Sequence, residues 1–231
     1  MGFPNRKRKL IMDEWLKEGL KKIKSTDYLK KRGVDENCKV SFFIWEPHKN
    51  IPCKRFKSSF GLQGEKLVGQ LIIPIYSPTN QIIGLECRRL RKDGSKQVHQ
   101  YRTIHAQWNP YLLGSKEAFD SLWEGNDLWI VEGIFDKVAL DKVLPSCDAV
   151  ASTLRAGMDS NTLDMIERFY SSLSTVYICY DNDETGRKKS YWLTKEMSKR
   201  GIRAIQWKYR GKDPGEVFSL GGEKALRRMF L

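Results

Sequence analysis

The pattern of apolar and polar positions predicts mainly β-strands in the first half of the chain. Four segments are apolar or alternate with a period of two: Val40–Trp45, Leu67–Tyr76, Gln81–Leu90 and Gln97–Thr103. Asp93 and Gly94 stand between the last two segments and predict a hairpin turn. Upstream, apolar residues at helical spacing predict a helix over Asp13–Lys24, and Thr26 and Gly33 bound a second, short helix. The first half is predicted to be a mixed domain with an antiparallel sheet.

The second half alternates between short apolar segments and longer amphipathic segments. The apolar segments predict strands at Leu128–Val131, Ala149–Ser152, Val176–Tyr180 and Arg203–Trp207. The amphipathic segments predict helices at Ser115–Trp123, Ile134–Leu144, Asn161–Tyr170 and Thr185–Arg200. This alternation predicts an α/β fold: a parallel sheet with helices on both faces, whose ligands bind beyond the carboxyl ends of the strands.

These sequence patterns divide the chain into three predicted parts. A basic, helical extension covers residues 1–25, a smaller mixed α+β subdomain covers residues 26–125, and the parallel-sheet domain covers residues 126–231. A chain of 231 residues is long enough to bury the cores that this division requires.

Cysteines and apolar runs indicate the compartment. The five cysteines are scattered, without a C-x-x-C pair, which favours reduced thiols over a disulfide framework or a zinc ribbon. No apolar run has the length of a membrane span. We therefore expect a soluble, cytoplasmic protein without zinc and without a membrane partner.

Charge is distributed unevenly along the chain. The net charge is +13; residues 1–115 hold 23 Lys and Arg against 10 Asp and Glu, whereas residues 116–231 hold 18 of each. A basic module beside a neutral one predicts that the first half binds a polyanion. The alternative is a generally basic, highly soluble protein.

Cations and aromatic rings interleave on the predicted hairpin of the first half. The candidate residues for nucleic-acid or nucleotide binding are Arg88, Arg89, Arg91, Lys92, Lys96, Tyr101 and Arg102. Cations neutralise phosphates and rings stack on unpaired bases, so this mixture suits a single strand. An ordinary charged sheet face is the alternative.

Acidic residues follow the predicted strands of the second half. Asp181 and Asp183 come directly after Val176–Tyr180, and in an extended backbone their side chains point to the same side. Two carboxylates this close are costly unless a cation lies between them, and Mg²⁺ prefers such oxygen ligands. The same residues are also good turn formers, so a solvated turn is the alternative.

Two further acidic groups are predicted at neighbouring strand ends. Glu132 follows Leu128–Val131, with Asp136 one turn later, and Asp213 lies beside Lys212 after the last strand. In isolation Glu132 reads as an exposed acid and Asp213 as a turn initiator before proline. Their agreement with the Asp181 loop favours one shared metal site.

Three motifs in this order resemble the Toprim domain of DnaG-type primases of bacteria and phages. Val131–Leu140 resembles the first motif, Asp181–Gly186 the second, and Lys212–Pro214 the third. Upstream, three segments resemble the basic subdomain of the same enzymes: Tyr28–Gly33, Gly69–Ile75 and Gly84–Arg88. The resemblance covers the chain from about Thr26 onward.

The resemblance implies roles for the acidic residues. Asp181, Asp183 and Asp213 would bind Mg²⁺ or Mn²⁺, Glu132 would be a metal ligand or the general base, and Asp136 would support them. Gly215 stands where the family commonly has a third acid, a contact that Glu216 would replace. The Lys-Tyr-x-Asn element of the family is represented only by residues 100–103. Lys212 would join the nucleotide-binding residues.

The resemblance further implies synthesis of short RNA primers on single-stranded DNA from nucleoside triphosphates, in a bacterial or phage-infected cell. Expected partners are the template, the nucleotides, and a replicative helicase or a separate zinc-binding or single-strand-binding protein. A Toprim nuclease and a non-catalytic nucleic-acid-binding replication subunit are the alternatives, because the fold alone does not fix the reaction.

Overall fold

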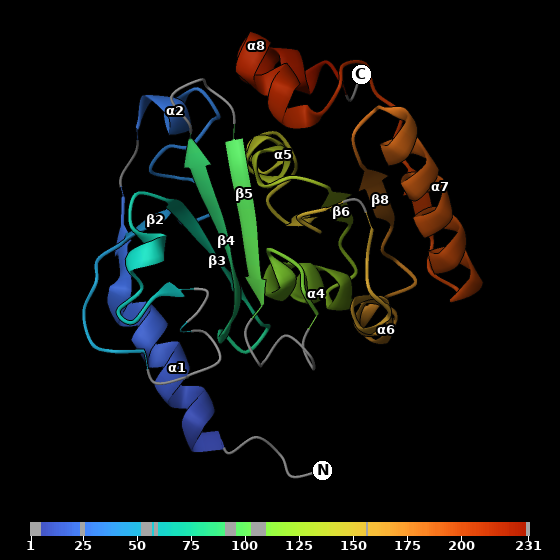
Figure 1. Ribbon diagram of the computed structural model, residues 1–231. Coiled ribbons are helices and arrows are strands. Elements are labelled where there is room, and N and C mark those ends of the chain that lie inside the picture. Colours follow the sequence, from blue (N-terminus) through green and yellow to red (C-terminus); the bar gives the residue numbers. More distant parts are fainter. Residues whose placement is uncertain are drawn as a thin grey trace. The chain divides into compact units, whose positions relative to one another are not determined.

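The computed structural model describes residues 6–23, 26–51, 57, 60–90, 96–102, 110–155 and 157–229 (Figure 1). Its internal contacts divide the chain into two units. Unit 1 comprises Met1–Lys24, Val40–Ile75 and Gln81–Trp108, and unit 2 comprises Ser25–Lys39, Tyr76–Asn80 and Asn109–Leu231. The predicted domain boundaries near residues 25 and 125 stay a prediction.

Unit 1 is built on a five-stranded sheet in the order β1-β2-β3-β4-β5. Its strands are β1 (Leu20–Lys22), β2 (Phe43–Trp45), β3 (Leu71–Tyr76), β4 (Ile82–Leu90) and β5 (Lys96–Arg102). β1 and β2, β2 and β3, and β4 and β5 pair antiparallel. The predicted antiparallel component is confirmed. Leu67, predicted to begin a strand, instead ends the 3-10 turn Glu65–Leu67.

The first helix differs from its prediction. α1 spans Arg6–Gly19, and Leu20–Lys22 leave it to pair with Phe43–Trp45 as an edge strand. A Cβ atom at Gly19 would lie 2.2 Å from the Trp45 ring, so only glycine allows this close crossing. The prediction that this helix continues to Lys24 was therefore wrong. Pairing with β2 outweighs the helical spacing of Leu20.

Aromatic rings form one part of the unit 1 core. The Trp15 ring centroid lies 4.8 Å from Trp45, 5.4 Å from His48 and 6.4 Å from Phe60. Both indole nitrogens are satisfied: Trp15 Nε1 donates to the Lys49 carbonyl at 2.8 Å, and Trp45 Nε1 to the Gln63 carbonyl at 2.9 Å. Buried indoles with bonded nitrogens contribute apolar area without an unpaired donor.

Asp13 ties α1 to the sheet and provides a test of this unit. Its buried Oδ1 accepts the Ile82 amide hydrogen at 2.8 Å, and Lys17 lies 2.6 Å from Oδ2. Asp13→Ala is expected to lower the free energy of unfolding by about 2 kcal/mol, since the buried Ile82 amide loses its acceptor. Urea unfolding of both variants measures this effect; the exposed neighbour Glu14→Ala should change stability little, and equal effects would contradict the assignment.

Unit 2 contains the predicted parallel sheet, in the order β7-β6-β8-β9. Its strands are β6 (Leu128–Val131), β7 (Ala149–Ser152), β8 (Val176–Cys179) and β9 (Ala204–Gln206). All neighbouring pairs run parallel. The carboxyl ends of β6, β7 and β8 therefore lie at one edge of the sheet.

Helices cover both faces of this sheet, as predicted (Figure 1). One face packs against α4 (Ser115–Trp123), α6 (Ser160–Phe169) and α7 (Glu184–Lys199). The opposite face packs against α5 (Ile134–Leu140) and α8 (Pro214–Arg227). The short helix α2 (Asp27–Lys30) places the Tyr28 ring 5.7 Å from Phe135 of α5. Among the described residues, no helix has the length and apolarity needed to cross a membrane.

Candidate active site

The register of the parallel sheet brings the predicted acidic loops to one place. Val131, the last residue of β6, pairs with Cys179, the last residue of β8. Glu132 therefore follows β6 at the level where Tyr180 and Asp181 follow β8. Glu132 is half-buried, its backbone carbonyl accepts the Ser152 hydroxyl at 2.8 Å, and its charge acts on Tyr180.

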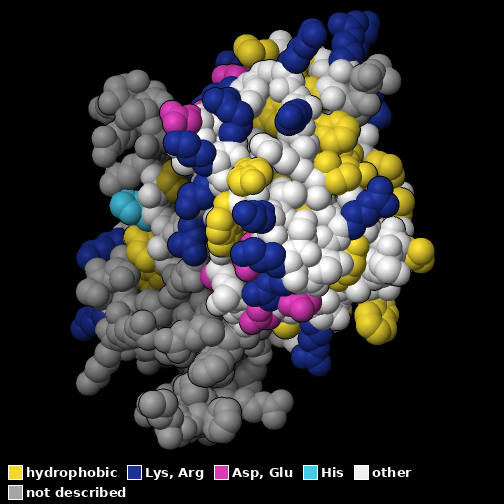
Figure 2. Space-filling view, turned by 90° about the vertical axis from the view of Figure 1, so that its right-hand side faces the viewer, with side chains coloured by type: hydrophobic (Ala, Val, Ile, Leu, Met, Phe, Trp, Pro, Cys, Tyr) yellow, Lys and Arg dark blue, Asp and Glu magenta, His cyan; other side chains and the backbone are white. Residues whose placement is uncertain are grey.

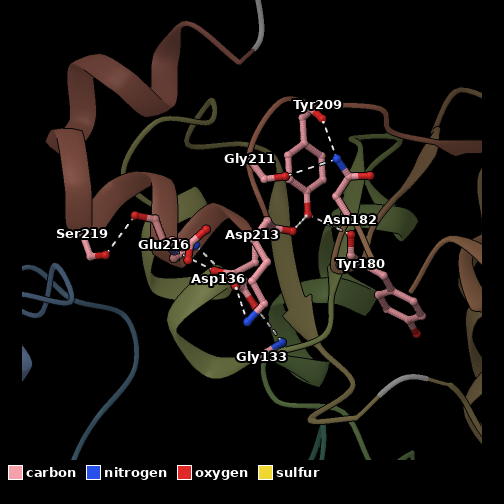
Figure 3. Close-up of polar contacts among 11 residues, drawn as sticks. Gly133, Asp136, Tyr180, Asn182, Tyr209, Gly211, Asp213, Glu216 and Ser219 are labelled. Carbon is pink, nitrogen blue, oxygen red and sulfur yellow. Dashed lines mark hydrogen bonds and ion pairs between the residues drawn. The ribbon is translucent and has the colours of Figure 1, made fainter. Parts of the chain in front are cut away.

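Asp136 is the most buried acid of the site (Figure 3). Its Oδ2 accepts the Gly133 amide hydrogen and its Oδ1 accepts the Gly215 amide hydrogen, each at 2.9 Å. Burial, followed by the charge of Asp213, raises the pKa of Asp136 to about 7; a side-chain hydrogen bond with Asp213 acts in the same direction. Through its bonds to Gly133 and Gly215, Asp136 therefore holds the start of α5 against the start of α8.

Asp181 carries a charge that Lys212 compensates only in part. Its side chain is half-buried, and within the described part of the chain it has no hydrogen bond or ion pair. Burial, then the charge of Asp213, raises the pKa of Asp181, and only Lys212 acts against this rise among the largest contributions. Such a carboxylate stores unfavourable electrostatic energy that a bound cation relieves.

Asp183 and Asp213 both cap helices. Asp183 precedes α7 and accepts the Gly186 amide hydrogen at 2.7 Å; Asp213 precedes α8 and accepts the Glu216 amide hydrogen at 2.6 Å. Each uses Oδ1 for this bond, as is typical of an N-cap aspartate. Both residues therefore start helices, and Asp213 also acts electrostatically on Asp136 and Asp181.

Two polar side chains hold the acidic loops in register (Figure 3). The Tyr209 hydroxyl lies 2.8 Å from the Tyr180 carbonyl oxygen and 3.1 Å from the Lys212 carbonyl oxygen. Asn182 donates its side-chain amide to the Tyr209 and Gly211 carbonyls at 3.2 Å, and its backbone amide to Lys212 at 2.7 Å. Neither Tyr209 nor Asn182 was predicted from the sequence to belong to the site. The position of Asn182 between the two aspartates was a usable signal; Tyr209 had none.

Two glycines permit close packing at the acids. A Cβ atom at Gly186 would lie 2.0 Å from the Asp181 carbonyl oxygen. At Gly215 it would lie 3.0 Å from Asp136 Oδ1 and 3.2 Å from the Phe135 carbonyl carbon. Gly215 therefore lets the α8 backbone approach Asp136. This close approach explains why glycine stands at the position where the resembled family commonly has an acid.

The remaining candidates of unit 2 lie around this cluster. Lys212 Nζ lies 3.8 Å from Asp213 Oδ2, and its charge lowers the pKa of Asp181. The charge of Glu216 acts on Asp181 in the opposite direction. The structure thus brings Asp136, Asp181, Asp213, Lys212 and Glu216 together.

The donor set fits a hard divalent cation that brings its own ligands. Within the described residues, no group of three or more His, Cys, Asp or Glu side chains is arranged to hold a metal ion. Mg²⁺ typically takes one or two protein carboxylates and completes its shell with water and substrate phosphates. Two neighbouring carboxylates whose charges interact, those of Asp181 and Asp213, match that requirement.

The candidate residues of unit 1 lie partly on the β4–β5 hairpin. Arg88 Nε donates to Glu86 Oε1 at 2.6 Å, and Gln100 donates to the other oxygen of this buried acid at 3.1 Å. Arg89 is exposed. The half-buried Tyr101 ring packs 4.9 Å from Phe60. Four candidates are not placed with their side chains: Arg91 and Lys92 lie outside the described residues, and Lys96 and Arg102 are described by their backbone alone.

Asp136 gives the metal-free protein an expected pH dependence. Its pKa is about 7 in the fold and 3.8 for the unperturbed group, so between these values the folded chain holds a proton that the unfolded chain has released. The free energy of unfolding should therefore fall as pH rises through this interval. Urea unfolding with a chelator measures it, and Asp136→Asn should flatten the slope. The surface variant Asp164→Asn should keep it; an unchanged slope in Asp136→Asn would contradict the assignment.

Comparison with known proteins shows which family the region of this site resembles. Residues 129–218, from β6 into α8, match the Toprim-like family. The acidic strand ends described above lie within that match, so the similarity covers the candidate site itself.

Curated relatives extend the similarity beyond this domain. The chain is 24% identical over 238 residues to the DNA primase of Aquifex aeolicus (strain VF5), covering 95% of this chain and 47% of that protein. It is 28% identical over 182 residues to the DNA primase of Rickettsia typhi (strain ATCC VR-144 / Wilmington), covering 71% and 30%. The chain thus spans less than half the length of these relatives.

Solved structures agree on the fold. The Aquifex aeolicus primase structure with zinc-binding and RNA polymerase domains superposes with a TM-score of 0.67 at 22% identity, covering 97% of this chain and 60% of that chain. A DnaG primase catalytic domain bound to ssDNA gives 0.66 at 19%, covering 97% and 82%. The predicted resemblance to DnaG-type primases with a Toprim domain is confirmed, and this chain has the fold of their catalytic core.

Proposed function

We propose that this protein synthesises RNA primers on single-stranded DNA by metal-dependent nucleotidyl transfer. The observation that carries the proposal is the half-buried Asp181 carboxylate, which faces the charge of Asp213 and has no hydrogen bond or ion pair among the described residues. The names of the relatives and the ssDNA-bound structure support the reaction class. They do not favour a nuclease or a non-catalytic subunit.

The acidic cluster would bind Mg²⁺ or Mn²⁺ through Asp181 and Asp213, with Asp183 as a further ligand. Bound there, the ion supplies charge neutralisation for the nucleotide phosphates and the leaving pyrophosphate. Glu132 is proposed as a further ligand or as the base that accepts the proton of the attacking 3′-hydroxyl. Asp136 positions Asp213 and the first turn of α8 through its bonds to Gly133 and Gly215.

Cations near the two regions would hold the substrates. Lys212 stands beside Asp213 and Asp181, a suitable place to contact a triphosphate. The exposed Arg89 on β4 is proposed to contact the template, together with Arg91, Lys92, Lys96 and Arg102. Arg88 is engaged with the buried Glu86, so we propose that it shapes the hairpin as well as binding phosphate. A replicative helicase or a zinc-binding or single-strand-binding protein is the proposed partner.

One assay tests this function. The protein is incubated with single-stranded DNA and labelled nucleoside triphosphates, with Mg²⁺, with Mn²⁺ or with a chelator. Short labelled oligoribonucleotides that require the metal are the expected product. Shortened template without new RNA would indicate a nuclease. Neither product, in the presence of candidate helicase and zinc-domain partners, would overturn the proposal.

A further inference from the structure

Helix α7 presents two large aromatic rings to solvent. Tyr191 is 64% exposed and Trp192 is 46% exposed. The helix meets the core through other residues, Leu193 and Met197, which are fully buried. Aromatic side chains usually contribute to cores or interfaces, so two adjacent exposed rings require an explanation outside the unit's own packing.

Lysines surround these rings at helical spacing. We define the α7 face as the following residues of this helix: Lys188, Lys189, Tyr191, Trp192, Lys195 and Lys199. Lys188 and Lys195 lie three or four residues from both rings, and Lys199 lies four residues beyond Lys195, so these side chains are neighbours on the helix surface. The face therefore has two lysines before the two rings and two lysines after them along the helix.

The charge of the α7 face is only partly neutralised. α7 contains two acids, Glu184 and Glu196, and they pair with Lys188 at 2.6 Å and Lys199 at 3.0 Å. Lys189 and Lys195 have no carboxylate partner anywhere in the described chain. The view onto this side of the molecule shows many Lys and Arg side chains and few Asp and Glu (Figure 2). Its electrostatic complement is an anion.

The helix starts at the candidate active site. Asp183 is its N-cap, and Arg187 Nη1 donates to the Asn182 carbonyl at 2.7 Å, which fixes the first turn to the acidic loop. With 16 residues, α7 is roughly 24 Å long, enough to accompany several nucleotides away from that loop.

We propose that the α7 face binds single-stranded nucleic acid, with Tyr191 and Trp192 stacking on unpaired bases and Lys189 and Lys195 contacting phosphates. A paired duplex hides the base faces that the rings would need. The α7 face belongs to a different element from the β4–β5 hairpin. The inference rests on the proposed function only for the statement that the bound strand continues from the acidic loop.

Binding of a short fluorescent oligothymidylate, followed by anisotropy without metal, tests the α7 face. Trp192→Ser is expected to weaken binding about tenfold, and Trp192→Phe should restore most of it, because phenylalanine retains a stacking surface. The double variant Lys189→Gln, Lys195→Gln should lower the slope of log K against log salt by about 1.4, since each single-strand phosphate contact contributes about 0.7.

Matched controls come from α4. Trp123 is 73% exposed on a helix with two acidic residues in its range, Glu117 and Asp120, and Lys116 is paired with Asp120. Trp123→Ser and Lys116→Gln should bind like the wild-type protein. Thermal melting confirms that each variant is folded.

Wild-type binding by Trp192→Ser and by the double lysine variant would overturn the inference, and so would equal weakening by Trp123→Ser. Such results would favour an acidic protein partner for α7. Primer synthesis by the wild-type protein is measured separately. If the protein makes primers but the α7 variants bind the oligonucleotide normally, only this inference is refuted. If the α7 variants bind weakly but the wild-type protein makes no primers, the proposed reaction is refuted and the α7 nucleic-acid surface is supported.

Discussion

Asp181→Asn is expected to reduce primer synthesis about a thousandfold while raising the thermal stability of the metal-free protein. Loss of a ligand removes several kcal/mol of metal-derived stabilisation from the transition state, and each 1.36 kcal/mol is about tenfold in rate. Stability should rise because burial and the charge of Asp213 disfavour the ionised Asp181, as its raised pKa shows. Asparagine keeps the shape and removes the charge.

Opposite changes in activity and stability distinguish a functional carboxylate from a structural one. Primer yield and melting temperature are measured for each variant, with and without Mg²⁺. In the wild-type protein Mg²⁺ should raise the melting temperature, because it binds the folded state alone; in Asp181→Asn this increase should be smaller. Asp164→Asn, which removes a surface charge paired with Arg200, should preserve synthesis. Full synthesis by Asp181→Asn would show that the metal assignment is wrong.

Gly186→Ala is expected to lower the free energy of unfolding by about 3 kcal/mol, the upper part of the range for overpacking. The added Cβ would meet the Asp181 carbonyl oxygen at 2.0 Å, and this neighbour is backbone, which yields less readily than a side chain. Either α7 or the Asp181 loop must move. Primer synthesis should fall as well, because a shift of either segment displaces residues of the proposed metal site.

Gly201→Ala provides the comparison for this effect. Gly201 has a φ of 74° and no atom within 4 Å of an added Cβ, so its replacement introduces backbone strain without a collision. That strain costs about 1 kcal/mol. Chemical denaturation of the two variants separates collision from strain, and equal losses would argue against the close approach of Gly186 to Asp181.

Regular alternation made the second half predictable. β6, β7 and α4 begin and end where the sequence predicts, since each combines a clear periodicity with flanking turn residues. The helix α8 was missed, although Asp213 as N-cap and Pro214 at the first position are its start signals. Asp-Pro was instead interpreted as a turn, and Gly221 and Gly222 weakened the helical pattern that follows. Gly222 indeed leaves the helical conformation, with φ 66° and ψ −164°.

The sequence predicts which residues of the site follow the strands, but it does not predict which distant residues they contact. The acids after β6 and β8 could be identified because strand order brings their loops together. The bond between Asp136 and the Gly215 amide joins residues 79 positions apart, and the sequence contains no signal for it. The Arg88–Glu86 pair was likewise hidden, because alternation predicts which face a residue occupies and leaves its hydrogen-bond partner open.

Tyr209 connects the loops after β8 and β9 through a single hydroxyl. Burial raises the pKa of Tyr209, so this group remains a donor throughout the ordinary pH range. Because the same oxygen lies within hydrogen-bonding distance of the Tyr180 and Lys212 carbonyls, the backbone positions next to Asp181 and Asp213 shift together. We expect this link to limit how far the two carboxylates can separate, so that cations of different ionic radius would bind there with different affinity.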